Sequence, residues 1–252
     1  MLIDRTCRRA IVVGFGAVLA SFAVSPIVWA SLPMAAASVT LSLATWLAVS
    51  VTLWRSRQLL DPGATRLGAA THLTLLRGLL VSVAAGFAAV PPMGAARWLP
   101  ALLYATAAIC DRFDGILARR LGQTTVLGAR LDEAMDALGL LVAPIVAVSW
   151  GRLPPWYLLV GVTYYIYRSA IWMRRRLELP VHVERVKRRQ ITRIFAGLQM
   201  TLVSVALAPI LSREVNSIAA TLLMVPTLAF FARDWLIVIG RPLPTRTAHA
   251  LQ

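Results

Sequence analysis

The chain has 252 residues, of which 58% are hydrophobic and 15% are charged, and its mean hydropathy is +0.71. A soluble domain must cover its surface with polar side chains, so this composition excludes that class and indicates an integral membrane protein. The net charge is +15, and 26 basic residues carry it, all of them arginine except Lys187. Such a balance also occurs in nucleic-acid-binding proteins, and the positions of the arginines decide between the two classes.

Eight long apolar runs follow one another along the chain. A bilayer core of about 30 Å needs roughly 20 apolar residues per helix, so each run predicts a transmembrane helix. The runs are continuous and rich in Ala, Leu and Val, which favours helices over alternating strands. The predicted fold is therefore an all-α, polytopic membrane helix bundle. The runs are 10–30, 36–54, 72–90, 98–118, 127–149, 155–173, 193–212 and 216–239.

The basic residues are distributed unevenly between the two ends of these helices. With a cytoplasmic N-terminus, most of them fall in cytoplasmic segments, and only Arg97, Arg152 and Arg213 lie in segments on the opposite side. This asymmetry is the positive-inside pattern, and it also favours contact with anionic lipids. It indicates a multi-pass protein of the cytoplasmic (inner) membrane with lipid rather than nucleic acid as its surroundings.

The chain divides into an N-terminal hairpin and a larger core. Residues 1–30 also resemble a secretory signal, but their apolar run is longer than a usual signal core, which favours a retained helix. The polar stretch after the second run contains the helix-breaking pair Pro62-Gly63 and is suited to a short amphipathic helix on the membrane surface. The predicted division is a transmembrane hairpin (1–54), an interfacial linker (55–70), a six-helix core (71–240) and a cytoplasmic tail (241–252).

Acidic residues gather in the stretch DRFDGILARRLGQTTVLGARLDEAMD, residues 111–136, which holds five of the eleven in the chain. Asp111 and Asp114 are three apart and Asp132 and Asp136 are four apart, so each pair shares one helix face. The polar turn GQTT between them predicts a helical hairpin that brings the pairs together. Four carboxylates just inside a membrane repel one another and need positive charge. With oxygen ligands only, hard cations fit best: Mg²⁺, Mn²⁺ or Ca²⁺.

Two other interpretations of these carboxylates are consistent with the sequence. The aspartates can pair with Arg112, Arg119 and Arg130 in a purely structural network, or they can line a pathway for cations or protons. The glycines beside the acids argue for a ligand instead, because Gly115 and Gly128 leave the backbone bare, and Arg119 offers a fork for phosphate. Metal, bare backbone and arginine together suit a phosphate ester.

The spacing Asp111-x2-Asp114-Gly115-x2-Ala118-Arg119-x8-Gly128-x3-Asp132-x3-Asp136 resembles the complete signature of the CDP-alcohol phosphatidyltransferase family. The segment from Thr71 to Arg77, THLTLLR, is similar to that family's element on the preceding helix, where Asn often stands in place of Thr71. The resemblance covers about residues 66–240 and leaves out the N-terminal hairpin.

The resemblance implies transfer of a phosphatidyl group from CDP-diacylglycerol to a hydroxyl acceptor, with release of CMP, by a homodimer. It implies that two divalent cations, Mg²⁺ or Mn²⁺ with Ca²⁺ as a non-physiological occupant, are held by the four aspartates, and that Asp136 also takes the proton of the acceptor hydroxyl. Contacts to the CDP-lipid are expected from Thr74, Asp111, Gly115, Ala118, Arg119 and Gly128.

The acceptor is predicted less directly. Arg168 and Arg193 lie at ends of predicted helices, where they can face the site and bind an acceptor phosphate. Glycerol 3-phosphate is the first choice, ahead of inositol phosphate, another lipid or an amino alcohol. The neighbouring basic residues 174–176 and 187–189 can equally anchor the loop to anionic lipid.

Overall fold

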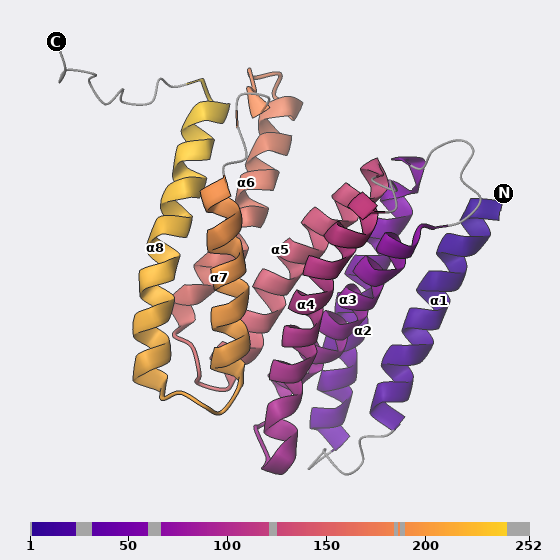
Figure 1. The fold of residues 1–252 in the computed structure, drawn as a ribbon, viewed down its shortest axis with the longest axis vertical. Coiled ribbons are helices and arrows are strands. Elements are labelled where there is room, and N and C mark those ends of the chain that lie inside the picture. Colours follow the sequence, from indigo (N-terminus) through magenta and orange to yellow (C-terminus); the bar gives the residue numbers. More distant parts are fainter. Residues whose placement is uncertain are drawn as a thin grey trace.

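The computed structural model describes residues 2–23, 32–59, 67–120, 125–183, 186 and 190–240. Eight long helices make up most of this part of the chain, and short 3₁₀ helices extend or join them (Figure 1). The long helices are α1 Leu2–Ala23, α2 Leu32–Ser56, α3 Ala69–Ala85, α4 Leu99–Arg120, α5 Val126–Ser149, α6 Leu159–Arg176, α7 Gln190–Leu207 and α8 Arg213–Val238. The short ones are η1 Arg57–Leu59, η2 Gly86–Ala89, η3 Gly94–Trp98 and η4 Pro155–Leu158. Each predicted apolar run coincides with one long helix, and the all-α bundle is confirmed.

The first helix differs most from its predicted bounds, because it begins at Leu2 rather than at residue 10. The polar segment before the apolar run contains no Gly or Pro, so nothing in it ends a helix. Apolarity marks the part of a helix that suits lipid, whereas the backbone helix continues through the charged turn that contains Arg5, Arg8 and Arg9. Residues 24–31, and residues 60–66 of the predicted interfacial linker, lie outside the described part.

The helices run up and down in an antiparallel bundle. Helices α3, α4 and α5 form its middle, α1 and α2 lie on one side, and α6, α7 and α8 lie on the other (Figure 1). The start of α1 and the end of α8 are at the same end of the bundle, together with the junction of α4 and α5. The eight predicted membrane crossings are an even number, and an even number of crossings places both ends of the helical part on the same side of the membrane.

Two apolar clusters hold the bundle together. The larger one joins α3, α4 and α5 to α6, α7 and α8, around fully or nearly fully buried residues such as Val146, Tyr157 and Val203. The smaller one joins the hairpin to α3 and α5, around Trp46, Val49 and Leu53 of α2. The hairpin is thus packed into the protein rather than tethered beside it.

Three helical segments of the described chain are long and apolar enough to cross a membrane: Pro33–Leu59, Ala69–Ala89 and Arg213–Val238. The last of these shows a lipid-facing stripe, because Ile218, Leu222 and Val225 are 63%, 68% and 59% exposed and recur at helical spacing. The chain is a multi-pass membrane protein. Membrane crossing by the other five long helices stays a prediction from their apolar runs.

Candidate active site

The acidic stretch folds as the predicted helical hairpin. Asp111 and Asp114 lie near the end of α4, and α5 begins at Val126 after a turn of which residues 121–124 lie outside the described part. The hydroxyl oxygen of Thr125 accepts a 3.0 Å hydrogen bond from the backbone N–H of Gly128 and so caps α5. This N-cap starts the helix that carries the second acidic pair.

The two pairs converge. One carboxylate oxygen from each of Asp111, Asp114 and Asp132 lies within 4.8 Å of the other two. Asp114 is buried, and Asp111 and Asp132 are half-buried. Three hard oxygen ligands at this separation form a set that suits a divalent cation. Asp136, one turn beyond Asp132, is not among these three, and it joins the cluster through an arginine.

That arginine is Arg77 of α3, which is only 3% exposed. Its Nη1 lies 2.6 Å from Asp111 Oδ1, 2.8 Å from Asp132 Oδ1 and 3.9 Å from Asp114 Oδ2. Its Nη2 pairs with Asp136. One guanidinium therefore contacts all four aspartates, and when all five groups are ionised the cluster keeps a net charge of −3.

Arg77 is the residue that sequence reasoning missed, since the alternative structural network named Arg112, Arg119 and Arg130 instead. Arg130 lies 3.9 Å from Glu133, and Arg112 has no ion pair with a described carboxylate. The side chain of Arg119 is outside the described part. An isolated arginine within the apolar run of α3 was a usable signal, because an ionisable residue at membrane depth is a functional-site candidate by default.

Thr74 lies one turn before Arg77 on the same face of α3. Its hydroxyl donates a 3.1 Å hydrogen bond to Asp114 Oδ2. The sequence reading placed Thr74 at the CDP-lipid, and the structure gives it a direct partner among the carboxylates. Helix α3 thus contributes a hydroxyl and a guanidinium to a cluster whose carboxylates come from α4 and α5.

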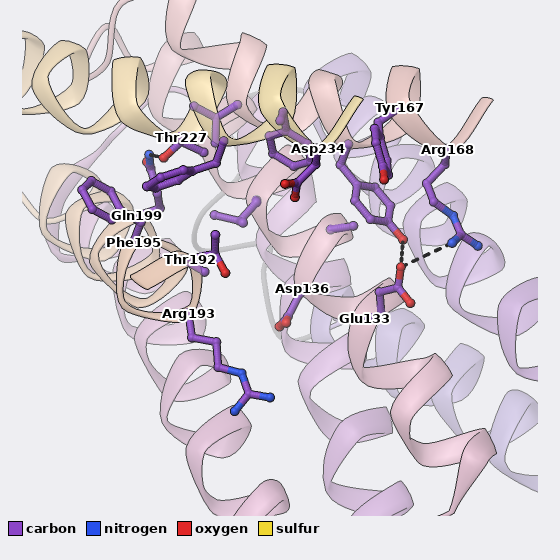
Figure 2. A pocket seen from close by; sticks show the side chains of 18 of the residues that line it. Glu133, Asp136, Tyr167, Arg168, Thr192, Arg193, Phe195, Gln199, Thr227 and Asp234 are labelled. Atoms are coloured by element: carbon purple, nitrogen blue, oxygen red, sulfur yellow. Dashed lines mark hydrogen bonds and ion pairs between the residues drawn. The ribbon is translucent and has the colours of Figure 1, made fainter. Parts of the chain in front are cut away.

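A cavity of about 480 Å³ opens beside the carboxylates, between α5, α6, α7 and α8. Asp132 and Asp136 belong both to the carboxylate cluster and to the wall of this cavity. Figure 2 shows Asp136 pointing into it, with Arg193 of α7 on the side opposite Arg168 of α6. A molecule in the cavity would therefore lie next to Asp136 and between two arginines.

The arginines of the cavity differ in their surroundings. Arg168 Nη1 is 3.5 Å from Glu133 Oε1, and the same oxygen accepts a 3.0 Å hydrogen bond from the Tyr164 hydroxyl (Figure 2). Arg193 is exposed and has no ion pair with a described carboxylate. Arg193 is the more available of the two for an anionic ligand. Glu133 and Tyr164 are further residues that the sequence reading did not single out.

The inner end of the cavity is closed by a buried amide, Gln199 of α7. Its Nε2 donates to the Leu223 carbonyl oxygen at 3.0 Å and to the Thr227 hydroxyl at 2.8 Å, and its Oε1 accepts from the Tyr157 hydroxyl. The side chain is fully buried and both of its ends are satisfied, so it fixes α7 against α8 and η4.

The residues expected at the CDP-lipid are only partly described. Gly115 is half-buried one position after Asp114. Among the described residues, a β-carbon on Gly128 would meet only the Thr125 hydroxyl, at 3.1 Å. The side chains of Ala118 and Arg119 lie outside the described part. An open backbone surface beside the carboxylates fits the expectation of a ligand there.

Comparison with known proteins identifies the family. Relatives include a protein of Wigglesworthia glossinidia brevipalpis named CDP-diacylglycerol–glycerol-3-phosphate 3-phosphatidyltransferase, 37% identical over 87 residues, which are 34% of this chain and 46% of that protein. A protein of the same name from Cereibacter sphaeroides is 33% identical over 75 residues, 30% of this chain and 34% of that protein. A probable phosphatidylglycerophosphate synthase of Mycobacterium tuberculosis is 39% identical over 97 residues, 37% of this chain and 46% of that protein. The alignments thus span less than half the length of each relative. The family model of the CDP-alcohol phosphatidyltransferases matches residues 67–239, which contain the carboxylate cluster and the cavity, and the chain belongs to that family.

Proposed function

We propose that the protein transfers the phosphatidyl group of CDP-diacylglycerol to glycerol 3-phosphate and releases CMP. The observation that carries this proposal is the convergence of the signature aspartates beside a cavity whose wall contains two of them, Asp132 and Asp136, together with two arginines. The names of the relatives support both the donor and the acceptor. The family membership speaks against the alternative of a cation or proton pathway.

The chemistry of the carboxylate cluster suits a divalent metal ion. Asp111, Asp114 and Asp132 offer hard carboxylate oxygens, and the Arg77 guanidinium offsets only one of four negative charges. The remaining charge favours Mg²⁺ or Mn²⁺, with Asp136 as the fourth ligand. Bound there, the metal would polarise the pyrophosphate and stabilise charge on the departing CMP.

The residues at the cavity have separate roles in this proposal. Asp136 faces the acceptor and takes the proton of its hydroxyl as the hydroxyl oxygen forms a bond to the phosphorus of the phosphatidyl group. The bond between that phosphorus and the CMP oxygen breaks with its electron pair on CMP. Asp136 is suited to the role of proton acceptor because it belongs both to the carboxylate cluster and to the cavity wall. The ion pair with Arg77 holds the Asp136 carboxylate toward the cluster.

The acceptor phosphate is assigned to Arg193 and Arg168. Both line the cavity that Asp136 enters, and a planar guanidinium binds phosphate through two donors. Arg193 has no competing ion pair with a described group, whereas Arg168 is shared with Glu133. The CDP-lipid is assigned to the opposite side of the carboxylates, at Gly115, Ala118, Arg119 and Gly128, with Thr74 supporting Asp114.

We place the site at the cytoplasmic face of the inner membrane. The excess of arginine in segments on one side supports that orientation, and the junction of α4 and α5, the two helices of the carboxylates, is at the same end of the bundle as the start of α1. Water-soluble glycerol 3-phosphate would reach the cavity from the cytoplasm, and the donor would enter from the surrounding lipid.

The test is a CMP-release assay on the purified protein with CDP-diacylglycerol and separate acceptors. Glycerol 3-phosphate should support the fastest release, above inositol phosphate, serine and phosphatidylglycerol. Preference for another acceptor would correct the acceptor alone. A folded protein that releases no CMP with any acceptor but carries ions across vesicle membranes would overturn the proposal.

A further inference from the structure

The N-terminal hairpin lies outside residues 67–239, which the family model matches, yet it shares a buried apolar cluster with the helices of the site. The members on α2 and α5 are Trp46, Val49, Leu53, Leu127, Leu131 and Met135. Leu131 and Met135 immediately precede Asp132 and Asp136 in the sequence. The hairpin therefore packs against the back of the two turns of α5 that carry these carboxylates.

The hairpin also approaches the site closely at Gly78 of α3. A β-carbon placed there would lie 2.9 Å from Met135 Sδ and 3.1 Å from a methyl carbon of Val49. Val49 is fully buried. Gly78 directly follows Arg77, and Met135 directly precedes Asp136, the partner of Arg77. Helices α2, α3 and α5 thus meet immediately behind the ion pair of Arg77 and Asp136, and there is no room for an added methyl group at Gly78.

A second close approach fixes the other end of the same seam. A β-carbon on Gly86, the first residue of η2 directly after α3, would lie 2.5 Å from the Ser38 hydroxyl oxygen and 2.6 Å from that of Ser42, so α2 also approaches closely there. Small residues at helix interfaces allow this spacing. Gly78 and Gly86 are eight positions apart, about 12 Å along the helix. These two contacts set how near α2 can lie to α3.

From this arrangement we infer that the N-terminal hairpin is a positioning element of the site: α2 sets the spacing of α3 against α5 at which Arg77 reaches Asp132 and Asp136. In a close-packed interior a displacement at Gly78 passes directly to the adjoining turns. Displacements near 1 Å can lower a rate by about 10²-fold. Val49 and Gly78 are positioning residues in this sense and touch no substrate. The inference rests on the proposed function only in that turnover is one of its two readouts.

The experiment uses the full chain with four substitutions: Gly78→Ala, Val49→Ala, the two combined, and Gly78→Ala with Val18→Ala. Binding of Mn²⁺ and CMP release are measured per folded molecule, with melting temperature recorded for each variant. Gly78→Ala should weaken Mn²⁺ binding about tenfold or more, as loss of outer support to a metal site does. Val49→Ala should restore part of that loss, because it removes the two methyl carbons at 3.1 and 3.3 Å from the new β-carbon and so lets α3 shift away from Met135.

Val18→Ala is the matched control for the rescue. Val18 is a fully buried valine of the same cluster, but it lies on α1, and the atoms nearest to a β-carbon at Gly78 belong to Met135 and Val49 instead. It should lower the melting temperature as Val49→Ala does and restore nothing. Rescue by both valine changes, by neither, or an unchanged Mn²⁺ affinity in Gly78→Ala would overturn the inference. If the unaltered chain releases no CMP, the proposed function fails, while the Mn²⁺ series still decides the role of the hairpin.

Discussion

The Nη1 atom of Arg77 on α3 lies 2.6 Å from Oδ1 of Asp111 on α4, and the same nitrogen lies 2.8 Å from Asp132 on α5. One buried guanidinium thereby ties α3 to the two helices that carry the carboxylates. Buried ions are costly to dehydrate, and a buried cation among the four carboxylates offsets part of that cost. Arg77 therefore contributes to stability and to the geometry of the carboxylates at once.

Replacing Arg77 with Met should destabilise the protein by about 3–5 kcal/mol in the presence of a chelator, because four carboxylates lose their buried cation. Added Mn²⁺ should raise the melting temperature more in this variant than in the unaltered chain, since the net charge of the cluster changes from −3 to −4. Arg112→Met is the control, because Arg112 lies next to Asp111 in the sequence but has no ion pair with a described carboxylate. Equal losses in the two variants would contradict the role assigned to Arg77.

Asp136→Asn should lower CMP release by at least about 10³-fold, roughly 4 kcal/mol of barrier, while the protein stays folded and binds CDP-lipid. The amide cannot take the acceptor proton and is a poorer ligand for a hard cation. Asp234→Asn changes another acid of the cavity wall, one that pairs with Arg233 rather than with the cluster, and should change the rate only a few-fold. Near-normal CMP release by Asp136→Asn would remove Asp136 from the reaction.

Removal of divalent metal should abolish CMP release, and Mg²⁺ or Mn²⁺ should restore it. The reason is the set of three carboxylate oxygens within 4.8 Å, which carries no softer ligand. Zn²⁺, which prefers nitrogen and sulfur, should restore less. Turnover that continues after thorough chelation, in protein shown by elemental analysis to be metal-free, would exclude a metal-dependent reaction.

The N-cap of α5 gives a separate test of how the helical hairpin supports the site. Thr125→Ala removes the acceptor for the Gly128 N–H and should cost about 1 kcal/mol of stability. Ser212 caps α8 in the same way through the Val215 N–H, at 3.4 Å, far along the chain from the carboxylates. Both changes should lower the melting temperature, but only Thr125→Ala should also weaken Mn²⁺ binding. Equal Mn²⁺ affinities in the two variants would show that the cap does not influence the cluster.

Most of the fold and the carboxylate positions could be predicted because they depend on local patterns. Apolar length gives helices at membrane depth, and the spacing of Asp111, Asp114, Asp132 and Asp136 places each pair on one helix face. Arg77 escaped because its partners are 34 to 59 positions away, and sequence spacing does not tell which arginine a carboxylate meets across a bundle. The packing of Val49 against Gly78 was beyond reach for the same reason.

The acceptor site allows the sharpest prediction from the contacts of Glu133. Arg193→Ala should raise the KM for glycerol 3-phosphate by about 10- to 100-fold, the usual cost of a lost hydrogen bond to a charged group, and leave the KM for CDP-diacylglycerol unchanged.

Glu133→Gln should lower the KM for glycerol 3-phosphate, because it removes the negative charge 3.5 Å from Arg168 and leaves that guanidinium for the phosphate. Tyr164→Phe is the matched control, since it removes the hydroxyl that donates to Glu133 but preserves the ion pair. If Arg193→Ala raises both KM values together, Arg193 supports the cavity as a whole. If Glu133→Gln raises the KM for glycerol 3-phosphate, Glu133 itself contacts the acceptor, and the phosphate is bound by Arg193 without Arg168.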